Sequence, residues 1–161
     1  MEIVKAKKKY AQGYCRALGQ VASEGKWLAS SEGIPLEDCK SFIAACSFTR
    51  SVQLFLLDGK EVVGWCDIVP LAVGEKIDDK VGSLGIGIVE SARGHGWGGK
   101  LIDKALDMAR RRFEKVVLFV REDNERAKEL YFSRGFTVIE RYEKGEYKNV
   151  DSPVLKMQRG Q

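Results

Sequence analysis

The sequence predicts one α+β domain over residues 1–161, with a central mixed, mostly antiparallel sheet and helices on both of its faces. Apolar runs with the spacing of strands alternate with runs that have helical spacing. The first strands are joined by hairpin signals, whereas the later ones are separated by helices. A chain of 161 residues, 44% apolar and 31% charged, is long enough to bury one core.

The N-terminal third is expected to contribute one strand and two helices. Residues 2–7 have the pattern of a strand, and residues 11–23 have apolar side chains at helical spacing. A loop rich in Ser and Gly, residues 30–33, precedes Pro35, which suits the first position of a helix. The second helix carries one apolar stripe, formed by Leu36, Cys39, Phe42, Ile43 and Cys46. We expect both helices to cover one face of the sheet.

The middle of the chain reads as strands. Residues 52–57 and 61–69 flank Asp58-Gly59, and this dipeptide between apolar runs is typical of a hairpin. Residues 70–80 are polar and are expected to form a longer loop. Residues 81–89 form the next strand.

The second half alternates between helices and strands. A glycine-rich turn is followed by a helix over residues 100–112 and a buried strand over residues 116–120. A helix over residues 124–134 ends at Gly135, which suits a left-handed cap. Residues 136–142 and 150–157 then form two strands around a turn at Lys144-Gly145. No repeat, low-complexity tract or interdomain linker is present.

Composition excludes several classes of protein. The net charge of +4 is mild, and no long basic stripe is interleaved with aromatics, so a nucleic-acid partner is not expected. No signal peptide or membrane-length apolar run is present, which argues against a membrane partner. Four cysteines without a C-x-x-C pair, together with a single histidine, predict no metal site. Reduced thiols then favour a cytoplasmic protein.

The stretch Arg93 to Gly99 reads R-G-H-G-W-G-G and lies between a predicted strand and a predicted helix. The start of a helix presents unpaired backbone N–H groups and the positive end of its dipole. Glycines allow a phosphate to approach the backbone closely. The stretch therefore predicts the binding of a phosphorylated cofactor.

Two cofactors compete for this turn. Gly94, Gly96 and Gly99 match the dinucleotide fingerprint G-x-G-x-x-G, and Glu122 lies where a ribose-binding acid is expected. A dinucleotide-binding fold would need several more β–α–β units after the turn. Only one helix and two or three strands follow, so this alternative is the weaker one.

The other alternative begins with Arg93. R-G-x-G-x-G after a strand resembles the pyrophosphate motif of the GNAT superfamily of acyl-CoA-dependent N-acetyltransferases. Residues 124–136 also reproduce that family's N-x-x-A-x-x-L-Y-x-x-x-G-F pattern. The resemblance implies a single acetyltransferase domain with an acetyl-CoA-binding core over about residues 81–136.

The resemblance implies that backbone N–H groups of the turn wrap the CoA pyrophosphate. They belong to Gly94, His95, Gly96, Trp97, Gly98 and Gly99. Arg93 would add positive charge, although a surface salt bridge is the other role open to it. His95 is interpreted as a loop residue near phosphate more readily than as a base. Trp97 would equally suit packing at the helix start.

The preceding strand is implied to splay from its neighbour and to pair with the pantetheine arm through Ile86, Gly87 and Ile88. Gly85 and Gly87 weaken an ordinary strand, which fits either the approach of a ligand or a bulge. Asn124 is implied to bind the CoA arm, and it also suits a helix N-cap. Tyr131 is implied to protonate the leaving thiolate, the alternative being a buried aromatic.

The implied reaction is direct attack of a neutral primary amine on the acetyl thioester, with a backbone N–H stabilising the oxyanion. Residues 80–84 lack the carboxylate that often serves as base in relatives, and Phe119 replaces another. Asp67 is the nearest substitute, although a solvated turn position suits it equally well. Glu32 and Glu90 are weaker candidates, and a water chain without a dedicated base stays open.

The acceptor is expected to be a small amine, with a peptide N-terminus as the alternative. The pocket would be built from the first two helices and the last hairpin, and candidate lining residues are Trp27, Glu32, Trp65 and Tyr147. A non-catalytic CoA-binding module and a dinucleotide-binding module are the rival functions. The resemblance also implies a possible homodimer through the last strands.

Overall fold

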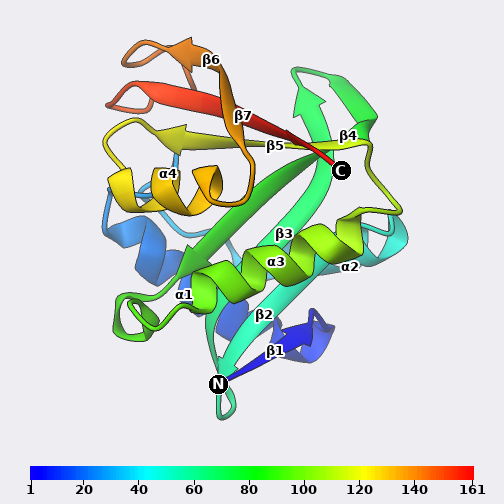
Figure 1. The fold of residues 1–161 in the computed structure, drawn as a ribbon. Helices are drawn as coiled ribbons and strands as arrows, with labels where there is room; N and C mark the ends of the chain where they lie inside the picture. The colour runs from blue at the N-terminus through cyan, green and yellow to red at the C-terminus, as the bar shows by residue number, and fades with distance from the viewer.

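The computed structural model describes residues 1–161 and contains a seven-stranded sheet in the order β1-β2-β3-β4-β5-β7-β6 (Figure 1). The strands are β1 Glu2–Lys5, β2 Val52–Asp58, β3 Glu61–Val73, β4 Lys76–Ile88, β5 Lys115–Arg121, β6 Thr137–Tyr142 and β7 Val154–Gly160. The helices are α1 Ala11–Ser23, α2 Leu36–Phe48, α3 Trp97–Ala109 and α4 Glu125–Phe132, with short 3-10 turns at Lys8–Tyr10 and Glu90–Ala92. Only β4 and β5 pair in parallel, so the mixed, mostly antiparallel sheet is confirmed.

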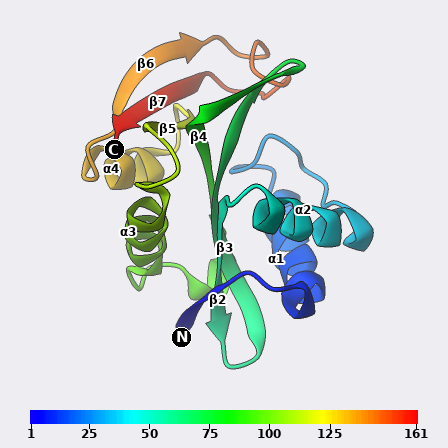
Figure 2. The ribbon, with the colours of Figure 1, turned by 90° about the vertical axis from the view of Figure 1, so that its right-hand side faces the viewer.

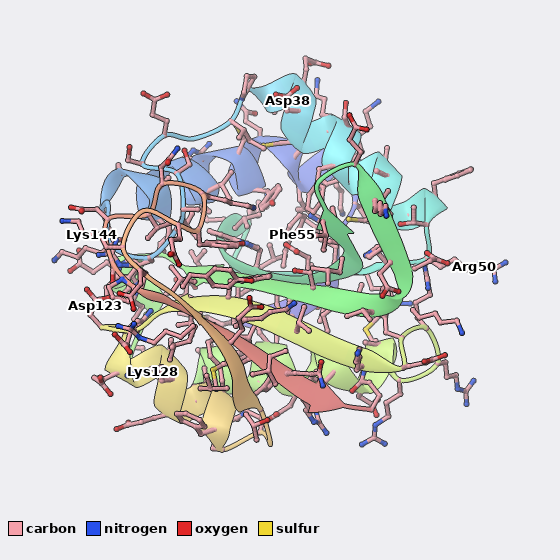
Figure 3. The ribbon with its side chains drawn as sticks, turned by 90° about the horizontal axis from the view of Figure 1, so that it is seen from above. Asp38, Arg50, Phe55, Asp123, Lys128 and Lys144 are labelled. Carbon is pink, nitrogen blue, oxygen red and sulfur yellow. The ribbon has the colours of Figure 1, made fainter.

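Helices cover both faces of the sheet, as the sequence predicts. Figure 2 shows α1 and α2 on one side, with α3 and α4 on the other. On the first side Phe55 is fully buried and stacks on Tyr14 with ring centroids 5.0 Å apart. Seen from above, Phe55 lies in the interior, whereas Asp38 and Arg50 project from the periphery (Figure 3).

The second side is filled by α3. Its apolar residues recur at helical spacing, and Leu101, Ile102 and Ala105 are completely buried against β2, β3 and β5. The helix begins at Trp97, earlier than the predicted residue 100, because Gly96 adopts the left-handed conformation directly before it. No helix of the structure is long and apolar enough to cross a membrane.

The predicted loop over residues 70–80 is wrong. Strand β3 continues to Val73 and β4 begins at Lys76, so that only a tight turn with Gly74 at φ 60° separates them. Residues 76–80 are polar because this end of the hairpin is exposed to solvent. Pro70 is tolerated in β3 because the register shifts between it and the next residue.

The chain between β6 and β7 is longer than predicted. Strand β7 begins at Val154 instead of residue 150, and residues 143–153 form turns. Lys148 and Asn149 adopt positive φ values of 47° and 56° within it. A non-glycine backbone is strained in this conformation, and such strain is often found at functional sites.

Candidate active site

The sheet opens between β4 and β5. These parallel strands pair at only three positions, from Val81↔Lys115 to Ser83↔Val117. Beyond these positions β4 continues to Ile88 and β5 continues to Arg121, but the two strands no longer pair with each other. A cavity of about 970 Å³ occupies the opening, in the size range of a cofactor site. The splay implied by the sequence is therefore present.

The glycines of β4 follow from close packing on its neighbour β3. A Cβ atom on Gly87 would overlap the Trp65 ring, and one on Gly85 would lie 3.1 Å from an oxygen of Asp67. The register between β3 and β4 is continuous here, so the alternative of a bulge is wrong. Ile86 and Ile88 are half-buried and line the cavity.

The glycine-rich loop forms one end of the cavity. Gly94 and Gly96 have φ values of 85° and 79°, which only glycine adopts readily. Gly96 caps α3, so the first N–H groups of that helix have no partner within it. The loop residues that line the cavity are Gly94, Gly96, Trp97, Gly98 and Gly99. His95 is exposed and does not line it.

Arg93 is held by a carboxylate. Its guanidinium donates two hydrogen bonds to Glu24, at 2.9 and 2.7 Å, and a third to the carbonyl oxygen of Ile88. The ring of Trp27 lies 5.4 Å from the guanidinium carbon. Both side chains of the ion pair are 23% exposed, so this contact ties the glycine loop to the end of α1. A direct contribution of Arg93 to pyrophosphate binding stays a prediction.

Replacing Glu24 by Gln is expected to lower the free energy of unfolding by about 1–3 kcal/mol at neutral pH, because a half-buried guanidinium loses its ionic acceptor. Hydrogen bonding to Arg93 lowers the pKa of Glu24 below its ordinary value of 4.5. The stabilisation is therefore complete above that value and is lost as the pH falls through the lower pKa of the folded state. Urea denaturation of wild type and Glu24→Gln at several pH values should show that their free energies of unfolding become equal at low pH.

The matched control is Glu37→Gln, which removes an exposed ion pair with Lys40. Exposed pairs contribute about 0–1 kcal/mol, so little change is expected. Equal losses in the two variants would contradict a special role for Glu24.

Arg126 was missed by the sequence reasoning. It lies within the N-x-x-A motif on α4, lines the cavity and approaches the position of a Cβ on Gly94 to 3.9 Å. It makes no ion pair, unlike Arg93 and Arg121, which also line the cavity. Its place in the first turn of α4, two residues after the N-cap Asn124, is the signal that would have found it.

The cavity is also lined by Tyr131 of α4 and by Asn124 at its N-cap. The Tyr131 ring packs edge-on against Phe136 and is 7% exposed, and its hydroxyl makes no hydrogen bond within the chain. Burial raises the pKa of Tyr131 above its ordinary value, so the hydroxyl is protonated at neutral pH. The Asn124 side chain accepts a hydrogen bond from the N–H of Ala127 at 3.2 Å, which confirms the N-cap.

Aromatic rings also line the cavity. Phe119 and Tyr147 stack with centroids 4.5 Å apart, beside the strained residue Lys148. Trp27 lines the cavity from the loop after α1. Trp65 is instead a core residue that packs on Tyr14, and Glu32 is exposed outside the cavity.

The candidate bases occupy different environments. Asp67 is 8% exposed in the middle of β3, so its interpretation as a solvated turn residue is wrong. Burial raises the pKa of Asp67 to about 7. Glu90 lines the cavity but is exposed. The structure contains no cluster of three or more His, Cys, Asp or Glu side chains that would hold a metal ion.

Comparisons with known proteins agree with this geometry. The family model described as the acetyltransferase (GNAT) family matches residues 23–136, a range that contains both sequence motifs. The chain is 32% identical over 131 residues to mycothiol acetyltransferase of Corynebacterium efficiens. That match covers 74% of this chain and 42% of the relative, so the chain spans less than half of the relative's length.

Two solved structures share the fold over nearly the whole chain. One is a ribosomal-protein-alanine N-acetyltransferase from Brucella melitensis, with 18% identity, a TM-score of 0.89 and complete coverage of both chains. The other is a putative acetyltransferase from Salmonella typhimurium with its cofactor acetyl-CoA, with 17% identity, a TM-score of 0.89 and coverage of 99% of this chain and 93% of that one. At this level of identity the likeness shows the shared fold.

Proposed function

Because the chain belongs to the GNAT acetyltransferase family, we propose that it transfers the acetyl group of acetyl-CoA to a primary amine of a small molecule. We treat residues 1–161 as one acetyltransferase domain, with residues 81–136 as its acetyl-CoA-binding core. One observation carries the proposal. The opening between β4 and β5 has the start of α3 at one end, a site suited to an anion, and Tyr131 among the residues that line it.

The chemistry of the cavity fits acetyl-CoA. Every second residue of β4 directs its N–H and C=O groups away from β3, toward the opening, where an extended pantetheine arm would pair with Ile86 to Ile88. The pyrophosphate would accept hydrogen bonds from the first N–H groups of α3. The unpaired guanidinium of Arg126 adds positive charge beside the loop. The amide nitrogen of Asn124 remains available to the arm, because the cap uses its oxygen.

The reaction proposed is direct attack. The amine nitrogen bonds to the carbonyl carbon of the thioester, and a backbone N–H of β4 stabilises the oxyanion. The carbon–sulfur bond then breaks, and Tyr131 gives its proton to the thiolate. Because burial raises the pKa of Tyr131, its hydroxyl is protonated at neutral pH, and the proton is present when the thiolate forms.

The lining residues Phe119, Tyr147 and Lys148 bear on the choice of acceptor. The two rings stack on each other, and the ammonium groups of Lys156 and Lys148 lie 5.8 and 5.4 Å from the centroids of Phe119 and Tyr147, so this pair already carries cations of the chain. Lys148 makes no ion pair, so an acceptor that also carries a negative charge would find a partner there. The free charge of Lys148 favours a compact amine that also carries a negative charge over a neutral peptide segment.

The test is acetyl transfer from acetyl-CoA to a panel of small amines, amino acids and short peptides, followed by mass spectrometry of the products. Acetylation of one class of small amine is the expected result. Acetylation of peptide N-termini alone would move the acceptor to proteins. Failure to bind acetyl-CoA would overturn the proposal, and tight binding of NADH in its place would support the dinucleotide alternative.

The glycine loop gives a second measurement. Gly96→Ala is expected to raise the KM for acetyl-CoA about tenfold with little change in kcat. Alanine in the left-handed conformation of residue 96 costs about 1–2 kcal/mol, so the loop would leave the conformation that binds the pyrophosphate. Gly59→Ala is the matched control, since Gly59 has φ 59° at the β2–β3 turn and does not line the cavity. Equal KM values in the two variants would contradict the loop's role.

A further inference from the structure

Acetyl transfer to an amine requires a group that removes a proton, because the acceptor arrives as an ammonium ion. The exposed carboxylates that line the cavity, Glu90 and Glu129, face solvent. Resting on the proposed acetyl transfer, we infer that Asp67 accepts this proton through a water molecule that lies between its carboxylate and the cavity above Gly85.

The sheet places Asp67 next to the cavity. In the antiparallel registers Gln53 is opposite Asp67, and Asp67 is opposite Gly85. Side chains of directly opposed residues share one face of a sheet, so these three residues form a row across β2, β3 and β4. An oxygen of Asp67 lies 3.1 Å from the position that a Cβ of Gly85 would take. The carboxylate thus lies over a residue that lines the cavity and has no side chain to block access.

Gln53 provides the second, independent observation. Its side chain is only 6% exposed, and neither its amide nitrogen nor its oxygen has a hydrogen-bond partner. A buried amide without partners is costly, and such groups are ordinarily satisfied by ordered water. Gln53 lies across Asp67 from Gly85, so water that satisfies its amide also reaches the Asp67 carboxylate from the β2 side, and the row can hold buried water.

The surroundings of Asp67 carry no compensating charge. The titratable groups that bear on it are Tyr14 from α1, Cys46 from α2 and its neighbour Cys66, whose side chain lies on the opposite face of β3. Burial raises the pKa of each, so all three are neutral near pH 7. Asp67 makes no ion pair, and burial alone raises its pKa to about 7. A base of this strength exchanges protons efficiently at neutral pH.

The protons balance. One proton passes from the ammonium through the water to the Asp67 carboxylate and leaves a neutral amine. The amine forms the new C–N bond, the C–S bond breaks, and the thiolate takes the proton of Tyr131. The second proton lost by the amide nitrogen restores the Tyr131 hydroxyl. Asp67 then releases its proton to solvent, so the net products are the amide, CoA thiol and one proton.

The test is the pH dependence of kcat/KM for wild type and Asp67→Asn with two amines of different basicity. For wild type we expect kcat/KM to increase with pH around a pKa of about 7 with both amines, because the group that titrates, Asp67, belongs to the enzyme and not to the substrate. In Asp67→Asn the rate is expected to fall about 10²-fold, and its rise with pH moves to the pKa of each amine. Asp58→Asn, at the exposed end of β2, is the matched control and should retain the wild-type profile.

Acetyl-CoA binding by calorimetry shows whether Asp67→Asn is folded. If it is not, Gln53→Leu decides. This apolar replacement removes the polar neighbour on the β2 side of the Asp67 carboxylate, so the same rise of kcat/KM is expected to move to higher pH. If the variant that folds has the same pH dependence of kcat/KM as wild type, Asp67 is not the base. The proposed function would be unaffected by that result. A wild-type chain that binds acetyl-CoA but acetylates no amine would overturn the proposed function, and the role of Asp67 with it.

Discussion

Tyr131→Phe is expected to lower kcat for acetyl transfer by about 10²–10⁴-fold while acetyl-CoA binds with unchanged affinity. The substitution removes one oxygen and retains the ring, which packs edge-on against Phe136 with ring centroids 6.0 Å apart. The lost hydroxyl makes no hydrogen bond within the chain, so the fold loses little. What disappears is the proton for the departing thiolate. Steady-state kinetics, with calorimetry for binding, separates the two effects.

Tyr142→Phe is the matched control. The Tyr142 hydroxyl donates a hydrogen bond to Glu140 at 2.9 Å on the surface, and Tyr142 does not line the cavity. Its kcat should equal that of wild type. A Tyr131→Phe enzyme with the wild-type kcat would show that solvent protonates the thiolate, and the general-acid role would be abandoned.

Gly87→Ala is expected to lower the free energy of unfolding by about 1–3 kcal/mol, the usual cost of overpacking a core. The added Cβ would overlap the ring of Trp65, which is 3% exposed and packs against Tyr14. Relief requires movement of β4 or of the indole. Because β4 also borders the cavity, acetyl-CoA binding should weaken in the same variant. Urea denaturation and calorimetry measure the two losses.

The control is the same substitution where space is free. A Cβ on Gly19, inside α1, would meet nothing within 4 Å. Gly19→Ala should therefore raise the free energy of unfolding by about 0.5–1 kcal/mol, because alanine loses less backbone entropy in a helix. A loss of stability in Gly19→Ala, or none in Gly87→Ala, would contradict the packing argument.

Signals confined to a few neighbouring residues were sufficient for much of this protein. The helical spacing over residues 11–23 coincides with α1, and the Asp58-Gly59 signal correctly marks the hairpin between β2 and β3, whose turn residues are Gly59 and Lys60. The glycine stretch lies at the start of α3, and Asn124 caps α4. Such features depend on backbone preferences, capping and periodicity, which act over one or two turns of chain. The family followed from two of these local motifs.

Tertiary contacts decided the rest. The segment over residues 70–80 forms the ends of β3 and β4 and the turn between them, because each strand supplies the backbone hydrogen bonds of the other, although residues 76–80 are exposed to solvent. Arg93 pairs with Glu24, 69 positions away, so its charge is balanced by a residue that no local pattern connects to it.

Asp67 differs from a solvated aspartate only through the strands and helices packed around it. They shield its carboxylate from bulk solvent and raise its pKa to about 7. The same packing places it beside Gly85 at the edge of the cavity. Local sequence determined which elements form. Burial and pairing between distant residues decided the charge state and the position of the groups on which the chemistry depends, because desolvation and Coulomb interactions act through space and not along the chain.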